Sequence, residues 1–476
     1  MNAYATLREI QLDLFRGTIT CEDLVRHHLS IIKHHAHLNA FLSVYETDAL
    51  AQAATIDQKI SSGSAGKLAG LIVGLKDVLS YKDHPLQASS EILHGFTSQY
   101  NATAVQRLLD EDAIIIGRQN CDEFGMGSSN ENSAFGAVKN GANPHRVPGG
   151  SSGGSAVAVQ MGMCRISLGS DTGGSVRQPA AFCGVIGLKP TYSRVSRYGL
   201  IAYASSFDCI GILGTATEDV ARVLEVIAGA DAFDSTVSTR PVPIFSDELQ
   251  AASEKKYRIA YIRETVESDG LQQEIKDTLQ HKLNRLKQEG HTLEAIDFPL
   301  LEYSLPTYYI LATAEASSNL SRYDGVRYGH RSSHTTTLDS LYKQSRTEAF
   351  GKEVQRRILL GTFVLSASYY DAYYAQAQKV RQLIRQRMVE IFKHHDFILL
   401  PTAPTTAFAF GANTTDPLQM YLADLYSVVA NVSGIPGISV PCGKDNLGLP
   451  IGLQVLAGDF QESALLKFSD LLLKLD

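Results

Sequence analysis

The sequence predicts an α/β protein built as one large domain. Residues 257–299 contain an apolar run, a helix and a second apolar run, which is the pattern of a strand-helix-strand unit. A second long helix, from about Asp371 to His394, leads into the apolar segment FILLP at 397–401. The 476 residues are 44% apolar, which is enough for a large core. No repeat and no long linker divides the chain, so a single domain over residues 1–476 is favoured over two.

The N-terminal segment, about residues 1–60 and including the first 45, is predicted to be helical. Thr20 and Asp23 form a capping-box pattern, in which a threonine caps the helix start and an acidic residue three positions later returns the contact. A loop of small residues, SSGSAGKLAG at 61–70, ends this segment. The apolar residues that share one face of the helix are Leu24, Val25, Leu29, Ile31 and Ile32.

Three apolar runs between residues 71 and 171 predict buried strands, and a fourth predicts a buried helix. Residues 118–136, rich in Gly, Ser and Asn, predict a loop over a pocket. Because α/β proteins place their chemistry at strand ends, Lys76 is well placed to serve a site. The strands are LIVGLKD at 71–77, AIIIG at 113–117 and RISLGSD at 165–171, and the helix is SAVAVQMG at 155–162.

The composition argues against several classes of partner and cofactor. The net charge is −7, so no basic surface for nucleic acid or an anionic membrane is indicated, although a local patch or another subunit could bring RNA. The six cysteines form no CxxC pair, which predicts free thiols in a reducing cytosol and no zinc site. No apolar N-terminal signal and no stretch of about 20 apolar residues is present, so we expect a cytoplasmic protein without a membrane or metal partner.

Two glycine-flanked serine clusters are the most informative feature, GGSSGGS at 149–155 and GSDTGGSVRQP at 169–179. Glycines let the backbone turn tightly and approach a ligand, so the two clusters can meet around one reacting atom. A serine hydroxyl is a poor nucleophile until a neighbouring base takes its proton. Lys76 can be that base if burial lowers its pKa from about 10.4. The pattern predicts a serine nucleophile that is activated without histidine.

Other interpretations of these clusters are weaker. Gly150, Ser152 and Gly154 formally match GxSxG, but that nucleophile elbow must follow a strand, and NPHRVPG with its two prolines comes before it. Neither a GxxxxGK[ST] loop nor a spaced GxGxxG is present here, so nucleotide binding has no local support. A flexible Gly/Ser linker is disfavoured, because apolar segments flank both clusters closely.

Together these residues resemble the amidase signature family. Both the motif and the spacing between Lys76, Ser151 and Ser175 fit that family. The resemblance implies a mixed β-sheet covered by helices on both faces. It also implies a triad in which Ser175 is the nucleophile, Ser151 relays its proton after a cis peptide bond, and Lys76 is the base. The signature core would be about residues 65–220, with the remainder completing the sheet and the substrate pocket.

The family also implies groups that support the nucleophile. An oxyanion needs preorganised N–H donors, and a DTGGS turn can aim several backbone amides at one point. Asp171 and Arg177 would form a supporting shell around that turn, with an ordinary surface ion pair as the alternative. The oxyanion donors that the resemblance implies are the N–H groups of Thr172, Gly173, Gly174 and Ser175.

Further segments resemble one branch of the family, the glutaminase subunits of tRNA-dependent amidotransferases. Among them are CDEFGMGSSNENSAFGAVKN at 121–140, EASSNLSRYDGVRYG at 315–329 and EVQRRILLGTF at 353–363. This implies hydrolysis of glutamine and delivery of ammonia to a partner that amidates glutamate on tRNA(Gln) or aspartate on tRNA(Asn). The implied partners are subunits B and C of a heterotrimer. tRNA would bind mainly through the partner subunit, which would also use ATP and Mg, while this chain needs no cofactor.

Glutamine recognition requires a cation for the α-carboxylate and an acid for the α-ammonium, and arginine suits a carboxylate bidentately. By resemblance, Arg357 and Asp424 take these two roles, and Ser128 and Tyr308 make further contacts. The neighbouring Arg356 leaves a one-residue ambiguity, and the register of the surrounding motif favours Arg357.

Two other functions compete with this interpretation. A stand-alone amidase acting on a small amide would share the triad, and a non-catalytic scaffold would keep only the fold. The chain also departs from the family pattern at two places: YKDHP at 81–85 lacks a glycine usual after the Lys-Asp pair, and DCIGI at 208–212 replaces DQIGP. These changes put in doubt the loop shape near the site and the route by which ammonia leaves.

Overall fold

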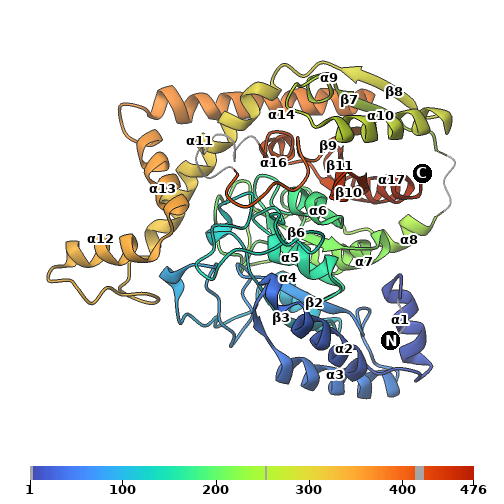
Figure 1. Cartoon of the computed structure of the whole chain (residues 1–476), viewed down its shortest axis with the longest axis horizontal. Helices are drawn as coiled ribbons and strands as arrows, with labels where there is room; N and C mark the ends of the chain where they lie inside the picture. The colour runs from blue at the N-terminus through green and yellow to red at the C-terminus, as the bar shows by residue number, and fades with distance from the viewer. Residues whose placement is uncertain (1–3, 252–254, 413–422, 476) are drawn as a thin grey trace.

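A single mixed sheet of 11 strands, flanked by helices, forms the centre of the molecule (Figure 1). The computed structural model describes residues 4–251, 255–412 and 423–475. The strand order along the sheet is β1-β3-β2-β4-β6-β5-β10-β11-β9-β7-β8. The predicted α/β class and the single large domain are therefore confirmed.

The sheet has parallel strands toward both ends and antiparallel strands in its middle. β3, β2 and β4 are parallel, as are β9, β7 and β8, whereas the strands from β4 to β9 pair antiparallel. The strands are β1 (Phe41–Val44), β2 (Ile72–Lys76), β3 (Ile114–Gln119), β4 (Ile166–Asp171), β5 (Ile186–Lys189), β6 (Cys209–Gly214), β7 (Arg258–Ile262), β8 (Thr292–Ile296), β9 (Phe397–Pro401), β10 (Gly437–Lys444) and β11 (Pro450–Ala457).

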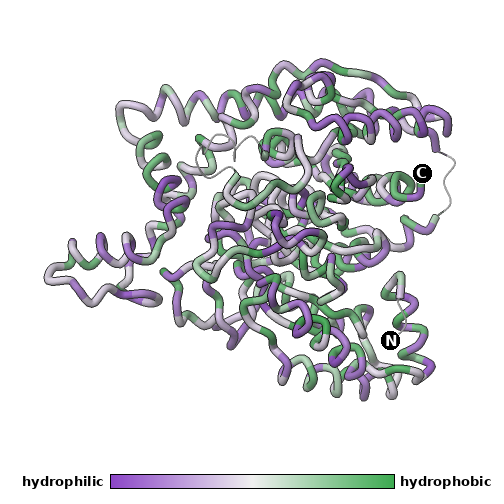
Figure 2. The backbone as a smooth tube through the Cα atoms, viewed as in Figure 1, coloured by the Kyte–Doolittle hydropathy of each residue, from purple (hydrophilic) through white to green (hydrophobic). Residues whose placement is uncertain are grey.

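Helices pack against the sheet along its length, and α11 to α13 extend to one side of it (Figure 1). Figure 2 shows hydrophobic segments gathered in the interior and hydrophilic ones along outer helices such as α10. The α-helices are α1 (Leu7–Phe15), α2 (Cys21–His34), α3 (Glu46–Ser61), α4 (Thr103–Asp110), α5 (Gly153–Gln160), α6 (Arg177–Cys183), α7 (Thr217–Ile227), α8 (Phe245–Gln250), α9 (Arg263–Val266), α10 (Gln273–Gln288), α11 (Leu301–Asn319), α12 (Leu338–Ala349), α13 (Lys352–Val364), α14 (Gln376–His394), α16 (Val428–Ser433) and α17 (Glu462–Lys474).

Most of the predicted elements are present. The capping box at the start of α2 forms in both directions: Asp23 N donates to Thr20 Oγ1 (3.0 Å) and Thr20 N donates to Asp23 Oδ2 (2.9 Å). The three predicted strands are β2, β3 and β4, which are buried throughout, and the predicted buried helix is α5. The predicted strand-helix-strand unit is β7, α10 and β8, with its two strands parallel.

The helical prediction for the first 45 residues is wrong at its end. Residues 41–44 form β1, an edge strand that pairs antiparallel with β3. So short a strand shows no period of its own, and its partner β3 comes much later in the chain. The helix predicted from Asp371 also begins later: a π-helical turn, η5 (Tyr370–Ala375), precedes α14.

The topology brings two strand ends with functional residues to the same edge of the sheet. β2 ends at Lys76, and its parallel neighbour β4 ends at Asp171, shortly before Ser175. The catalytic candidates therefore meet where the parallel part of the sheet joins the antiparallel part. In the portion of the chain that the structure describes, no helix combines the length and apolar character needed to cross a membrane.

Candidate active site

Lys76 and Ser151 contact each other in the interior of the protein. Both are fully buried, and Lys76 Nζ lies 2.6 Å from Ser151 Oγ and 2.8 Å from Ser170 Oγ. Burial lowers the pKa of Lys76, although nearby acidic groups such as Asp122 act in the opposite direction. A lysine in this environment is more readily neutral than one in water, and only neutral lysine can accept a proton from a serine hydroxyl.

The backbone around Ser151 is held by the loop after β3. The peptide bond between Gly150 and Ser151 is cis, as the family resemblance implied. Ser151 O accepts a hydrogen bond from Asp122 N (3.1 Å), and a Cβ on Gly150 would lie 2.0 Å from Asp122 Oδ2, so glycine is required there. In the described ranges the last strand before Gly150 is β3, which ends at residue 119, so the GxSxG elbow is excluded as expected.

Ser175 lies in the turn between the end of β4 and the start of α6. Its carbonyl oxygen accepts a hydrogen bond from Ser152 N (3.1 Å), so the two serine clusters meet as the sequence predicts. Ser175 is 8% exposed, whereas Lys76 and Ser151 are 0% exposed. The predicted nucleophile is thus the one member of the predicted triad that reaches toward solvent.

The N–H groups of the turn at Ser175 differ in whether they are hydrogen-bonded within the protein. Gly174 has φ +126°, a conformation that favours glycine, and its N–H donates to Asp171 Oδ1 (2.9 Å). Gly174 therefore shapes the turn, and its N–H is not available to an oxyanion, contrary to expectation. The N–H groups of Gly173 and Ser175 donate to no acceptor within residues 4–251, 255–412 and 423–475. Thr172 donates its hydroxyl proton to Asp208 Oδ1 (2.6 Å).

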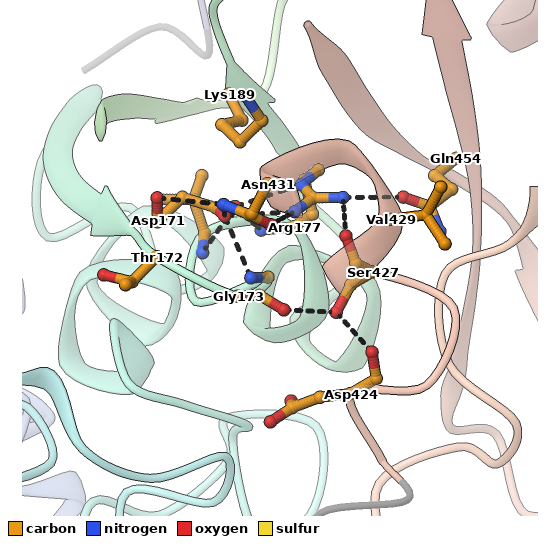
Figure 3. Close-up of polar contacts among 12 residues, drawn as sticks. Asp171, Thr172, Gly173, Arg177, Lys189, Asp424, Ser427, Val429, Asn431 and Gln454 are labelled. Atoms are coloured by element: carbon orange, nitrogen blue, oxygen red, sulfur yellow. Dashed lines mark hydrogen bonds and ion pairs between the residues drawn. The ribbon is translucent and has the colours of Figure 1, made fainter. Parts of the chain in front are cut away.

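Asp171 and Arg177 form a fully buried ion pair beneath this turn (Figure 3). Arg177 Nη2 lies 3.0 Å from Asp171 Oδ1, and Arg177 Nε lies 3.0 Å from Asp171 Oδ2. Arg177 also donates to Ser427 O (2.9 Å), Gln454 Oε1 (2.9 Å) and Asn431 Oδ1 (2.7 Å). Burial alone would raise the pKa of Asp171, but Arg177 holds it at about 2. An ordinary surface pair is excluded by this burial.

Replacing Arg177 with methionine is expected to lower the free energy of unfolding by about 3–5 kcal/mol, because Asp171 would keep its charge in the interior without the arginine that neutralises it. Denaturant unfolding followed by circular dichroism measures this change. Arg263→Met is the matched control, because Arg263 pairs with Asp297 at the surface and its loss should change stability little. Equal stability of Arg177→Met and wild type would contradict the structural role of the pair.

Arg357 on α13 is the buried member of the arginine pair. Its Nε donates to Glu353 Oε1 (2.8 Å), and its Nη1 donates to the hydroxyl of Tyr203 (2.7 Å). Arg357 is 2% exposed, whereas the side chain of Arg356 is 46% exposed and pairs with the other oxygen of Glu353. The burial and contacts of Arg357 agree with the choice made from the motif register.

Asp424 is buried and accepts hydrogen bonds from two hydroxyl groups. Ser128 Oγ lies 2.8 Å from each carboxylate oxygen, and the hydroxyl of Tyr309 lies 2.9 Å from Oδ2. Burial raises the pKa of Asp424 to about 7, while the hydrogen bonds and the charge of Arg357 act against this rise. The guanidinium of Arg357 lies over the ring of Tyr309, 5.4 Å from the ring centroid, and Tyr309 bonds to Asp424, so Arg357 and Asp424 lie at the same end of the site.

Sequence reasoning missed residues that complete this end of the site. Tyr309, the neighbour of the predicted substrate contact Tyr308, donates to Asp424. Tyr308 packs on Gly173 of the reacting turn, where a Cβ would lie 2.5 Å from its ring. Nothing local in the sequence marked Tyr309 or Tyr203 for these contacts.

The departure at residues 81–85 leaves the backbone in a conformation typical of glycine. Asp83 has φ +63°, and its N–H donates to Ser98 O (2.8 Å). Aspartate is one of the few residues that enter this region at modest cost. The loop therefore keeps a left-handed residue after the Lys-Asp pair although the sequence has no glycine there.

Comparison with known proteins identifies the class. The model of the Amidase family matches residues 23–466, so the chain belongs to the amidase family of enzymes. It is 49% identical over 464 residues to the A subunit of glutamyl-tRNA(Gln) amidotransferase of Chlorobium luteolum, covering 97% of this chain and 96% of the relative. The crystal structure of the corresponding A subunit from Thermotoga maritima superposes with a TM-score of 0.76 at 37% identity, covering 94% of this chain and 90% of that one. Native peptide amidase from Stenotrophomonas maltophilia gives a TM-score of 0.84 at 25% identity, covering 99% and 96%.

Proposed function

We propose that this chain is the glutaminase subunit of a tRNA-dependent amidotransferase. The observation that carries the proposal is the combination of a buried lysine-serine contact with a buried arginine and a buried carboxylate in one site. Lys76 and Ser151 supply amide chemistry, and Arg357 and Asp424 supply opposite charges for the α-carboxylate and α-ammonium of an amino acid. Similarity to the A subunits of amidotransferases along nearly the whole chain supports the same conclusion.

In the proposed reaction, the Ser175 hydroxyl attacks the side-chain amide carbon of glutamine. Its proton passes to Ser151, whose own proton passes to neutral Lys76 across the 2.6 Å contact. The N–H groups of Thr172, Gly173 and Ser175 stabilise the oxyanion. The C–N bond then breaks, the proton returns to the leaving nitrogen, and ammonia departs. Water hydrolyses the glutamyl ester on Ser175, which releases glutamate and restores the serine.

The released ammonia would serve a partner. We propose that subunits B and C complete a heterotrimer in the cytoplasm. The partner subunit binds most of the tRNA and uses ATP and Mg²⁺ to activate glutamate on tRNA(Gln) or aspartate on tRNA(Asn). This chain carries a net charge of −7, which suits a subunit that leaves tRNA binding largely to another chain.

Ammonia release from glutamine and from propionamide, with and without co-expressed partner subunits, tests the proposal. We expect glutamine to be preferred at least about 100-fold, because a site built around paired charges leaves them unmatched with a simple amide. The fold likeness to peptide amidase makes a stand-alone amidase the second candidate. A preference for propionamide would favour that candidate.

Arg357→Lys is expected to raise the KM for glutamine about 10- to 100-fold in the same assay, because lysine cannot bind a carboxylate through two parallel hydrogen bonds. The matched control is Arg356→Lys, in the neighbouring arginine, which is half-exposed and contacts Glu353 from the other side. We expect its KM to stay close to that of wild type. A larger effect in Arg356→Lys than in Arg357→Lys would reverse the assignment.

A further inference from the structure

Asp208 is a buried carboxylate that the proposed reaction does not use. It is 3% exposed and lies immediately before β6, opposite the end of β4 that carries the reacting turn. Its Oδ1 accepts the hydroxyl proton of Thr172 (2.6 Å), the first residue of that turn. Its Oδ2 accepts the N–H groups of Tyr203 (3.0 Å) and Ala204 (3.1 Å). One side chain therefore holds two separate segments.

The second of these segments leads to the amino-acid end of the site. The hydroxyl of Tyr203 accepts a hydrogen bond from Arg357 Nη1 (2.7 Å). A chain of contacts thus runs from the reacting turn through Asp208 and Tyr203 to Arg357.

We propose that Asp208 is a positioning residue that fixes the distance between the reacting turn and the Arg357 fork. The proposal rests on the proposed function, because it takes Thr172 to belong to the turn that binds the oxyanion and Arg357 to bind the α-carboxylate. Glutamine presents its reacting amide and its charged end at a spacing set by two methylene groups. A small displacement of one binding element from the other removes the near-attack geometry, so a rigid link between them supports the rate.

A double-mutant cycle tests the link. Thr172→Val removes the hydrogen bond to Asp208, and Tyr203→Phe removes the one from Arg357. Each single variant is expected to lower kcat/KM for glutamine about tenfold, because a hydrogen bond to a charged group is lost. If Asp208 joins the two segments, the fold-decrease in kcat/KM of the double variant is smaller than the product of the two single fold-decreases, by a factor of at least about three. The assay uses the full chain with its co-expressed partner subunits.

Two comparisons separate positioning from a general structural effect. Thr217→Val removes another threonine-aspartate bond of the same length, from Thr217 Oγ1 to Asp470 Oδ1 (2.6 Å), between α7 and α17. We expect it to keep wild-type kcat/KM and to show no coupling with Tyr203→Phe. Thr172→Ser, which keeps the hydroxyl, is expected to stay within about twofold of wild type.

Losses that simply multiply in the Thr172→Val/Tyr203→Phe variant would overturn the proposal, as would a Thr172→Ser variant as impaired as Thr172→Val. Wild-type ammonia release from glutamine tests the proposed function by itself. The cycle tests the link by itself, because it compares variants with the wild type on one substrate.

Discussion

Ser175→Ala is expected to abolish glutamine-dependent amidation while ammonia-dependent amidation continues at the wild-type rate. Alanine leaves no oxygen to form the glutamyl ester, and glutaminase activity should fall at least about 10⁴-fold. Free ammonia bypasses this subunit, since amidation itself would take place in the partner. Both activities can be followed on one preparation of the complex, supplied with either glutamine or an ammonium salt.

Ser469→Ala is a suitable control for this variant. Ser469 is a fully buried serine on α17, and its hydroxyl donates to Leu465 O (2.7 Å) within the same helix and not to the reacting turn. Both activities should stay near wild type in this control. Glutaminase activity retained in Ser175→Ala would remove Ser175 from the mechanism. Equal loss of both activities would show that the two reactions are not divided between subunits.

Lys76→Met is expected to lower kcat for glutamine hydrolysis at least about 10³-fold, because the proton from Ser151 would have no acceptor. The direction of the wild-type pH dependence follows from the same role. Lys76 acts as a base only when neutral, so kcat rises as pH rises through its folded pKa and falls below it. Burial lowers this pKa, which shifts the active range toward neutral pH.

Lys189→Met provides a matched comparison for the lysine. Lys189 is also fully buried with a pKa lowered by burial, but its Nζ donates to Pro190 O (2.9 Å) and not to a serine. We expect this variant to keep the wild-type pH profile of kcat whatever its stability. A Lys76→Met enzyme with near wild-type kcat, or a Lys189→Met enzyme that loses the acid limb, would contradict the assignment of the base.

The parts of the fold that the sequence predicts best are those with strong local patterns. β2 and β4 are short apolar runs bounded by glycine or charge, and α2 carries its own capping box. β1 could not be predicted in this way, because it has no sequence pattern of its own and is stabilised by pairing with β3. The same holds for the place of β10 and β11, which depends on pairing with β5 and β9, two strands that are distant along the chain.

The site shows a similar division. Lys76 and the two serine clusters could be predicted from the sequence, because their chemistry needs particular residue types at fixed spacings. The amino-acid end was reached only through resemblance, which assigned Tyr308 as a contact of the substrate and gave no role to Tyr309, the donor to Asp424. Asp208 begins the DCIGI segment noted in the sequence, but neither it nor Tyr203 could be given a role there, since only the fold shows that Asp208 meets Thr172 and that Tyr203 meets Arg357.

The position of β10 and β11 also bears on how the enzyme is made. These two strands come last along the chain, yet they lie between β5 and β9 and join the two halves of the sheet. During synthesis, the first six strands and the β7-β8-β9 group emerge from the ribosome with no direct pairing between them. The sheet becomes continuous only when residues 437–457 are available. A nascent chain therefore completes the sheet only after residue 457 has been made, and a premature stop before residue 437 leaves two separate sheets, not one sheet that lacks an edge strand.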